Sequence, residues 1–103
     1  MYFTYILQSE STSRYYIGST DNLDRRVAQH NDSGYKGSKT TKRFKGPWKL
    51  VYAESLQTRA EAMSREREIK SWKSRQAIHG LIISSDGRVL HEYWRIKHLV
   101  PGG

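Results

Sequence analysis

The sequence predicts an α+β fold, and three observations predict it. Two segments rich in β-branched and aromatic residues, 1–8 and 14–18, are separated by a polar turn. A third alternating segment follows at 48–53. Two further stretches begin with helix-capping residues. With 103 residues, of which 36% are hydrophobic, the chain can form one small domain with a single modest core.

The first two segments are expected to pair as an antiparallel hairpin whose turn is residues 9–13. Successive side chains of a strand point to opposite faces, so Tyr5 should share a face with Phe3 and Leu7. By the same rule Tyr16 shares a face with Gly18, which leaves room beside its ring.

A helix is expected next, from about 22 to 31, with its cap among residues 19–21. At 100° per residue, Arg25 and Gln29 should point away from the core. The opposite stripe mixes apolar residues with two functional groups: Leu23, Arg26, Val27 and His30.

Segment 32–46 is rich in glycine, serine and basic residues, and it is either a mobile basic loop or a solvated linker. Its cations are Lys36, Lys39, Lys42, Arg43 and Lys45. Beyond Pro47, the strand at 48–53 alternates Trp48, Leu50 and Tyr52 on one face against Lys49, Val51 and Ala53 on the other.

Thr58 and Glu61 form a capping-box pattern for a helix that ends near Lys73. Its expected apolar line is Ala62, Met63 and Ile69. Glu66 falls inside this line, and Arg59, Lys70 and Lys73 flank it.

A further helix is expected at 74–81. The tail from residue 82 fits a hairpin around Asp86-Gly87 and a helix equally well. Its Tyr93 and Trp94 could form a dimer surface, so a monomer and a weak homodimer both stay open.

Charge and composition narrow the function classes. Eighteen Lys and Arg against ten Asp and Glu give a net charge of +8, as expected of a protein that meets nucleic acid. The absence of cysteine excludes thiolate zinc sites and cysteine nucleophiles and fits a reducing compartment. No apolar run reaches the roughly 20 residues of a membrane span, and the N-terminus lacks signal-peptide features. We therefore expect a cytoplasmic protein without membrane contact.

Hydrolysis of a phosphodiester needs a base, cations that absorb phosphate charge, and usually a divalent metal. Arg26 can grip a phosphate with two parallel hydrogen bonds. A lone Glu66 suits magnesium, which keeps several waters. A tyrosine serves as a base only where a neighbouring cation lowers its pKa.

Each residue also has a structural alternative. Tyr5 and Tyr16 could be packing residues, and Arg26 could lie over the core with its head in water. His30 could be a hydrogen-bonded core histidine, and Glu66 could pair with Arg26 in an inert ion pair. The other histidines, His79, His91 and His98, lack metal-binding spacing.

Taken together, five segments resemble the GIY-YIG nuclease superfamily in order and spacing. They are Tyr5-Ile6-Leu7, Tyr16-Ile17-Gly18-Ser19-Thr20, Asn22-Leu23 with Arg26 and His30, Pro47 to Tyr52, and Glu61 to Lys70. The small standalone bacterial members are most similar, and the N-terminal nuclease domain of UvrC and the homing endonucleases are more distant. The resemblance covers residues 1–81, leaving 82–103 as an extension of uncertain structure.

This resemblance implies a three-stranded antiparallel sheet flanked by helices. It also implies a single divalent ion, Mg²⁺ or Mn²⁺, and an endonuclease that hydrolyses DNA phosphodiester bonds in repair or processing. RNA is a possible substrate, and a non-catalytic nucleic-acid-binding module on the same fold is the alternative. The implied catalytic residues are Tyr5, Tyr16, Arg26, His30 and Glu66, with Glu66 as the metal ligand. Nucleic acid would contact Lys36, Lys39, Lys42, Arg43, Lys45, Lys70 and Lys73.

Two positions depart from the family pattern. The first motif reads Phe3-Thr4-Tyr5, without its glycine. The asparagine that several family nucleases carry after the metal glutamate has no counterpart, since the asparagines here are Asn22 and Asn31.

Overall fold

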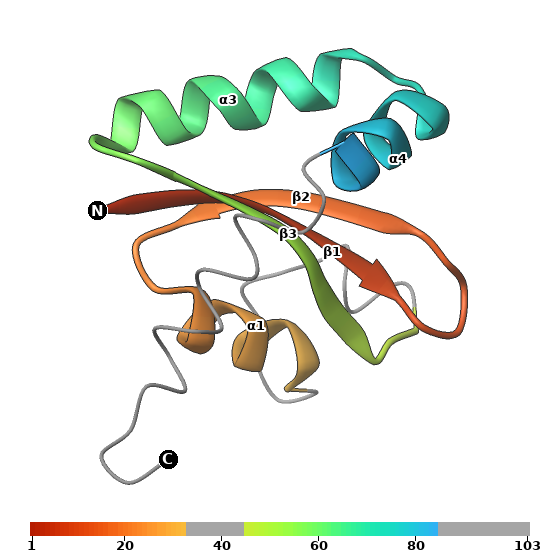
Figure 1. Ribbon diagram of the computed structural model, residues 1–103. Coiled ribbons are helices and arrows are strands. Elements are labelled where there is room, and N and C mark those ends of the chain that lie inside the picture. Colours follow the sequence, from red (N-terminus) through yellow and green to blue (C-terminus); the bar gives the residue numbers. More distant parts are fainter. Residues whose placement is uncertain (33–44, 85–103) are drawn as a thin grey trace, which may run out of the picture.

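The computed structural model describes residues 1–32 and 45–84, which form a sheet between two layers of helices (Figure 1). In chain order the elements are β1 (Tyr2–Ser9), β2 (Tyr15–Thr20), α1 (Leu23–Asn31), β3 (Trp48–Leu56), α3 (Arg59–Ser71) and α4 (Arg75–Ser84). Helix α1 covers one face of the sheet, and α3 and α4 cover the other. The expected α+β class is confirmed.

The sheet has three antiparallel strands in the order β2-β1-β3, as expected. The central strand β1 contributes more buried side chains than any other described element, because helices cover both of its faces. Tyr5 and Leu7 belong to the core on the α1 side, and Ile6 belongs to the core on the α3 side. The edge strand β2 pairs with β1 so that Gly18 lies opposite Tyr5.

Strand β3 contains a β-bulge that changes which face its residues meet. Ile6 pairs with Tyr52, but the next residue, Leu7, pairs with Leu50, so Val51 is the extra residue. Tyr52 therefore packs beside Ile6, on the opposite face from Leu50. The expectation that Tyr52 shares a face with Leu50 is wrong, because the bulge breaks the two-residue alternation.

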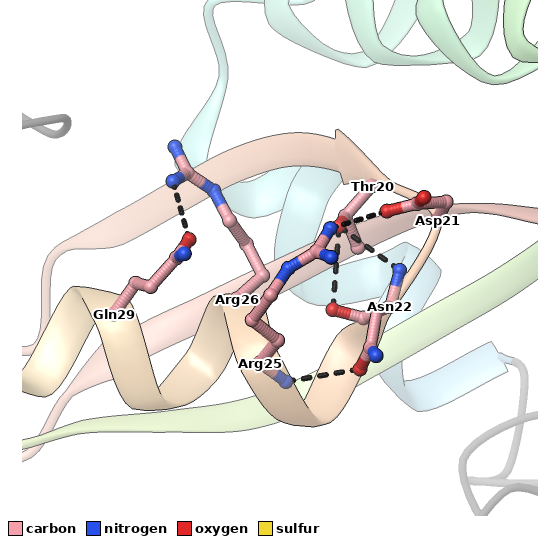
Figure 2. A network of polar contacts seen from close by, with 6 residues as sticks. All are labelled: Thr20, Asp21, Asn22, Arg25, Arg26 and Gln29. Atoms are coloured by element: carbon pink, nitrogen blue, oxygen red, sulfur yellow. Dashed lines mark hydrogen bonds and ion pairs between the residues drawn. The ribbon is translucent and has the colours of Figure 1, made fainter.

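The N-cap of helix α1 lies one residue after the segment in which it was expected. Asn22 is the N-cap, and its Oδ1 accepts a hydrogen bond of 3.0 Å from the backbone N–H of Arg25. Asp21 binds the guanidinium of Arg25 instead, and Thr20 Oγ1 accepts from the N–H of Asn22 at 3.1 Å (Figure 2). The expectation of a cap among residues 19–21 is therefore wrong by one position.

The last residue of α1 fastens the helix to the start of β3. Asn31 Oδ1 accepts the backbone N–H of Trp48 at 2.7 Å, and Asn31 Nδ2 donates to the Trp48 carbonyl at 2.8 Å. Trp48 is only 3% exposed and belongs to the core on the α1 side. This clamp fixes α1, which carries Arg26 and His30, against the sheet.

Helix α3 starts with the expected capping box, in which Thr58 and Glu61 bind each other's backbone N–H groups. Ala62 and Ile69 are fully buried, and Thr4 Oγ1 donates to the Ala62 carbonyl at 2.7 Å. Met63, however, is 39% exposed. Its expected place in the apolar line is wrong, since one residue along a helix turns the side chain by 100°.

Helix α4 continues to Ser84, three residues past its expected end. Its Ile78, Leu81 and Ile82 pack against the core on the α3 side. No helix in the described part of the chain is long and apolar enough to cross a bilayer. The alternatives for the tail after Ser84, including the suggested dimer surface, lie outside the described residues.

Candidate active site

The ring of Tyr5 lies across Gly18 of the edge strand β2, and this contact positions the first side chain of the site. A Cβ atom on Gly18 would lie 2.5 Å from the Tyr5 hydroxyl oxygen and 3.0 Å from Cε1 of Tyr16. No side chain fits there at such distances, so only glycine lets the phenol of Tyr5 extend over β2. The glycine therefore sets where the Tyr5 hydroxyl reaches.

Tyr5, Tyr16 and His30 form one aromatic cluster built from β1, β2 and α1. The Tyr5 hydroxyl lies 2.8 Å from His30 Nε2. The rings of Tyr16 and His30 have centroids 4.5 Å apart, and those of Tyr5 and Tyr16 are 6.2 Å apart. Three of the sequence-predicted site residues thus lie in mutual contact.

Arg26 lies one helical turn before His30 and interacts with both phenols. Burial alone lowers the pKa of Arg26, but hydrogen bonding and charge interaction with Tyr5 and Tyr16 outweigh it and leave the pKa raised. Its Nη1 donates to Gln29 Oε1 at 3.0 Å, and Figure 2 shows the guanidinium extending toward Gln29 while Arg25 extends toward Asp21. Arg26 is therefore held as a permanent cation beside the tyrosines.

The electrostatics of the cluster keep Tyr5 and His30 neutral. Burial, followed by the nearby Tyr16, raises the pKa of Tyr5 well above its usual value, although Arg26 acts in the opposite direction. Burial and then the charge of Arg26 lower the pKa of His30 to about 4. Near pH 7 Tyr5 is a phenol and His30 a neutral imidazole, so their hydrogen bond joins two uncharged groups.

Glu66 reaches this region from the other helical layer. Its side chain is 21% exposed, and its charge contributes to the raised pKa of Tyr5. Its Oε2 lies 2.6 Å from Lys70 Nζ, one turn along α3. The ion pair that the structure shows for Glu66 is therefore with Lys70, on the same helix.

The donor set around Glu66 fits only one kind of metal site. Within residues 1–32 and 45–84, no group of three or more His, Asp or Glu side chains could hold an ion. A zinc or preformed calcium site needs more protein ligands than this. A magnesium-type ion bound by one carboxylate, water and substrate phosphate fits Glu66.

A cavity of about 610 Å³ adjoins the cluster, between α1, the end of β2 and the start of α3. Its polar lining includes Ser19, Thr20, Arg25, Arg26, Gln29 and Arg59. Arg25 is exposed, as expected of a residue that points away from the core, and it lines the cavity from there. Gln29 was also expected to point away, but it is half-buried and bonds to Arg26, so that expectation is wrong. The contact of Gln29 with Arg26 could have been predicted from their spacing, because residues at i and i+3 are neighbours on a helix.

The sequence-predicted nucleic-acid-binding cations fall into three groups. Lys36, Lys39, Lys42 and Arg43 lie outside the described residues. Lys45 is exposed just before β3. Lys70 and Lys73 line a second cavity, apart from the one at Arg26, with Lys73 in the turn between α3 and α4 at φ 49°.

Comparison with known proteins gives consistent results. The GIY-YIG catalytic domain matches residues 1–79. A UPF0213 protein of Staphylococcus haemolyticus is 39% identical over 77 residues, covering 75% of this chain and 89% of the relative. A UPF0213 protein of Clostridium perfringens is 41% identical over 85 residues, covering 82% of this chain and 85% of the relative.

A solved structure agrees with both sequence matches. The solution NMR structure of a UPF0213 protein from Bacillus halodurans matches with a TM-score of 0.51 and 30% identity, over 84% of this chain and 88% of that one. The matched segment holds every described element from β1 to α3 and the first half of α4, and with them the tyrosines, Arg26, His30 and Glu66. This chain therefore belongs to the GIY-YIG catalytic-domain family.

Proposed function

We propose that this protein is a metal-dependent endonuclease that hydrolyses phosphodiester bonds in DNA. Family membership supports a nuclease in general. The observation that carries the proposal for this chain is the cluster of two phenols, a neutral imidazole and a guanidinium beside a basic cavity. Glu66 approaches the same cluster from the opposite helix.

In this proposal the cavity at Arg26 binds the phosphate backbone of the substrate. Arg25, Arg26 and Arg59 line it together with Asp21, which pairs with Arg25, so the walls keep a net positive charge. Arg26 donates two parallel N–H groups to the non-bridging phosphate oxygens, and its charge counts for more there than in water because the site is partly buried. As the attacking oxygen bonds to phosphorus, Arg26 stabilises the added negative charge.

In this proposal the proton of the attacking water goes to the oxygen of Tyr16 in its phenolate form, which thereby becomes a phenol. Tyr5 is unsuited to the role, because burial raises its pKa and keeps it protonated. Tyr16 is the remaining phenol of the cluster, and Arg26 interacts with it through a hydrogen bond and through its charge. Tyr5 and His30 then act as positioning residues, since their hydrogen bond holds the imidazole against the Tyr16 ring.

Glu66 is the residue that would hold the divalent ion, which would supply positive charge near the departing oxygen. The P–O ester bond breaks as the bond from the water oxygen forms, and the departing oxygen takes a proton from solvent. Lys70 pairs with Oε2 of Glu66 and so competes with the ion for this carboxylate, which has a second oxygen to offer as a ligand.

A cleavage assay with Mg²⁺, Mn²⁺ or EDTA on labelled linear, flapped and branched DNA and on RNA tests the proposal. Wild-type protein should give metal-dependent products. Glu66→Gln and Arg26→Gln should each lower the rate on the order of 10²-fold or more while leaving the fold intact. Arg67→Gln, an exposed change on the same helix as Glu66, is the matched control. Cutting by Glu66→Gln at the wild-type rate would reject the proposal.

A non-catalytic nucleic-acid-binding module is the second candidate. The ion pair of Glu66 with Lys70 favours it, because the lysine binds one oxygen of the carboxylate that a metal would need. Both candidates predict an affinity that falls steeply with salt as counterions are released. Only the endonuclease predicts products that require a divalent metal.

A further inference from the structure

We propose that the second cavity, around Tyr15, binds the phosphodiester backbone of the same nucleic-acid strand, next to the cleavage site. This inference rests on the proposed function, since it needs a nucleic-acid substrate. The cavity has a volume of about 370 Å³ and lies between the start of β2, the end of α3 and the start of α4. It does not share a lining residue with the cavity at Arg26.

Four cations from three separate segments line this recess: Arg14, Lys70, Lys73 and Arg75. No carboxylate belongs to the described residues that line it. The fold brings Arg14 beside the three cations of segment 70–75, of which Lys70 pairs with Glu66. This concentration of positive charge favours an anionic ligand. A nucleic-acid backbone is a polyanion with that chemistry.

Tyr15 is held in place within this recess. The Arg75 guanidinium carbon lies 4.7 Å from the centroid of the Tyr15 ring, a cation–π contact. The Tyr15 hydroxyl lies 3.3 Å from His79 Nδ1, on the same helix as Arg75. Together these contacts order Arg75 before any ligand binds, which reduces the entropy lost on binding.

The start of α4 adds a weaker attraction for anions. Ser74 caps the helix, since its Oγ accepts the backbone N–H of Ala77 at 3.1 Å. The N-terminus of a helix carries a partial positive charge that favours anions. This contribution supports the four side chains, which are the main determinants of the site.

Lys70 links the recess to Glu66 of the candidate active site, although the two cavities are separate. Lys70 lines the recess, while its Nζ lies 2.6 Å from Glu66 Oε2. Tyr15 also precedes Tyr16 on β2, and adjacent strand residues point to opposite faces. The recess therefore lies on the opposite face of the sheet from the aromatic cluster. A nucleic-acid strand whose scissile phosphate lies at Arg26 would run past Glu66 and around the edge of the sheet at β2 to reach the cations around Tyr15.

The test compares two double variants for binding to a labelled DNA duplex in EDTA, across a salt series. Arg14→Gln with Arg75→Gln removes two charges from the recess. Arg67→Gln with Lys49→Gln removes two charges from exposed positions outside both cavities. We expect the recess variant to lose about tenfold or more in affinity at low salt. Its slope of log affinity against log salt should flatten by about 1 to 2, as for two lost phosphate contacts.

The control variant should stay within about twofold of wild type and keep most of the salt slope. If wild type binds and cuts DNA while the two variants bind equally well, the proposed subsite is wrong and the endonuclease stands. If wild type neither binds nor cuts nucleic acid, both proposals fail.

An NMR titration of the wild-type protein makes the test independent of whether the variants fold. A short DNA duplex in EDTA should shift the backbone amide signals of Arg14, Tyr15 and Arg75. Inorganic phosphate at the same phosphate concentration should shift them less, because a free anion engages one contact at a time. Shifts confined to the region of Arg26, or equal shifts with inorganic phosphate, would overturn the proposal.

Discussion

The phenol of Tyr5 lies across Gly18 of the neighbouring strand, so that a Cβ atom at position 18 would fall 2.5 Å from the Tyr5 hydroxyl oxygen. The contact is with the functional end of the ring, and it explains why a glycine stands at this point of an otherwise β-branched and aromatic strand. It also makes the position of the hydroxyl sensitive to a single methyl group.

Gly18→Ala should therefore displace Tyr5 from His30. We expect a loss of about 1–3 kcal/mol in the free energy of unfolding, as for an overpacked core, and a larger loss of cleavage than stability alone explains. Chemical denaturation and cleavage rates at a temperature where the variant is folded measure both. Gly80→Ala is the matched control: a Cβ there meets nothing within 4 Å, so it should stabilise α4 by about 0.5–1 kcal/mol.

The two phenols should respond differently to removal of their hydroxyl groups. Tyr5→Phe breaks the buried hydrogen bond to His30, so it should cost about 1–3 kcal/mol of stability and lower cleavage modestly. Tyr16→Phe removes the proposed proton acceptor and should lower cleavage on the order of 10²-fold or more, with little change in stability. Thermal denaturation and single-turnover rates separate the two effects. The reverse pattern would assign the proton transfer to Tyr5.

Much of the arrangement was predictable from local sequence signals. The alternation around Tyr5 identified β1, and the Thr58 capping box identified the start of α3. The 100° periodicity placed His30 and Arg26 on the buried side of α1. These signals operate within a few residues, so they need no knowledge of the tertiary structure.

The errors arose where contacts distant in sequence decide the geometry. The bulge at Val51 depends on how β3 pairs with β1, and it moved Tyr52 to the other face. The clamp of Asn31 on Trp48 spans 17 residues and leaves no local pattern. Helical periodicity separates Gln29 from the core stripe, but it does not show that the side chain of Gln29 lies against Arg26. The grouping of cations around Tyr15 likewise required α4 to be placed beside β2.

The neutral His30 predicts how stability depends on pH. Its pKa is about 4 in the folded protein, below the usual 6.5, so between these values the unfolded chain binds a proton that the folded chain excludes. The free energy of unfolding should fall as the pH drops from about 6.5 to 4, by roughly 2–3 kcal/mol from this group. It should then become insensitive to His30 below that range.

Denaturant titrations from pH 4 to 8 measure this effect. Between pH 4 and 6.5, His30→Gln should reduce the slope of the free energy of unfolding against pH by the amount that corresponds to one bound proton. His79→Gln, a change at an exposed position, should keep the wild-type slope. A His30→Gln profile parallel to wild type would show that His30 is not kept neutral by burial and Arg26.

The ion pair of Lys70 with Glu66 predicts a change in metal affinity that does not depend on cleavage. If Glu66 is the metal ligand, Lys70 competes with the ion for its carboxylate. Lys70→Met removes the competing charge and keeps the aliphatic stem, so Mn²⁺ should bind about two- to fivefold more tightly, the range expected for a partly exposed ion pair. Paramagnetic resonance of free Mn²⁺ in a titration without nucleic acid measures this.

Lys49→Met, at an exposed position on β3, should leave the affinity unchanged, and Glu66→Gln should abolish the binding. Weaker Mn²⁺ binding by Lys70→Met would mean that the lysine supports the metal site, and that Glu66 does not bind the ion in the way proposed.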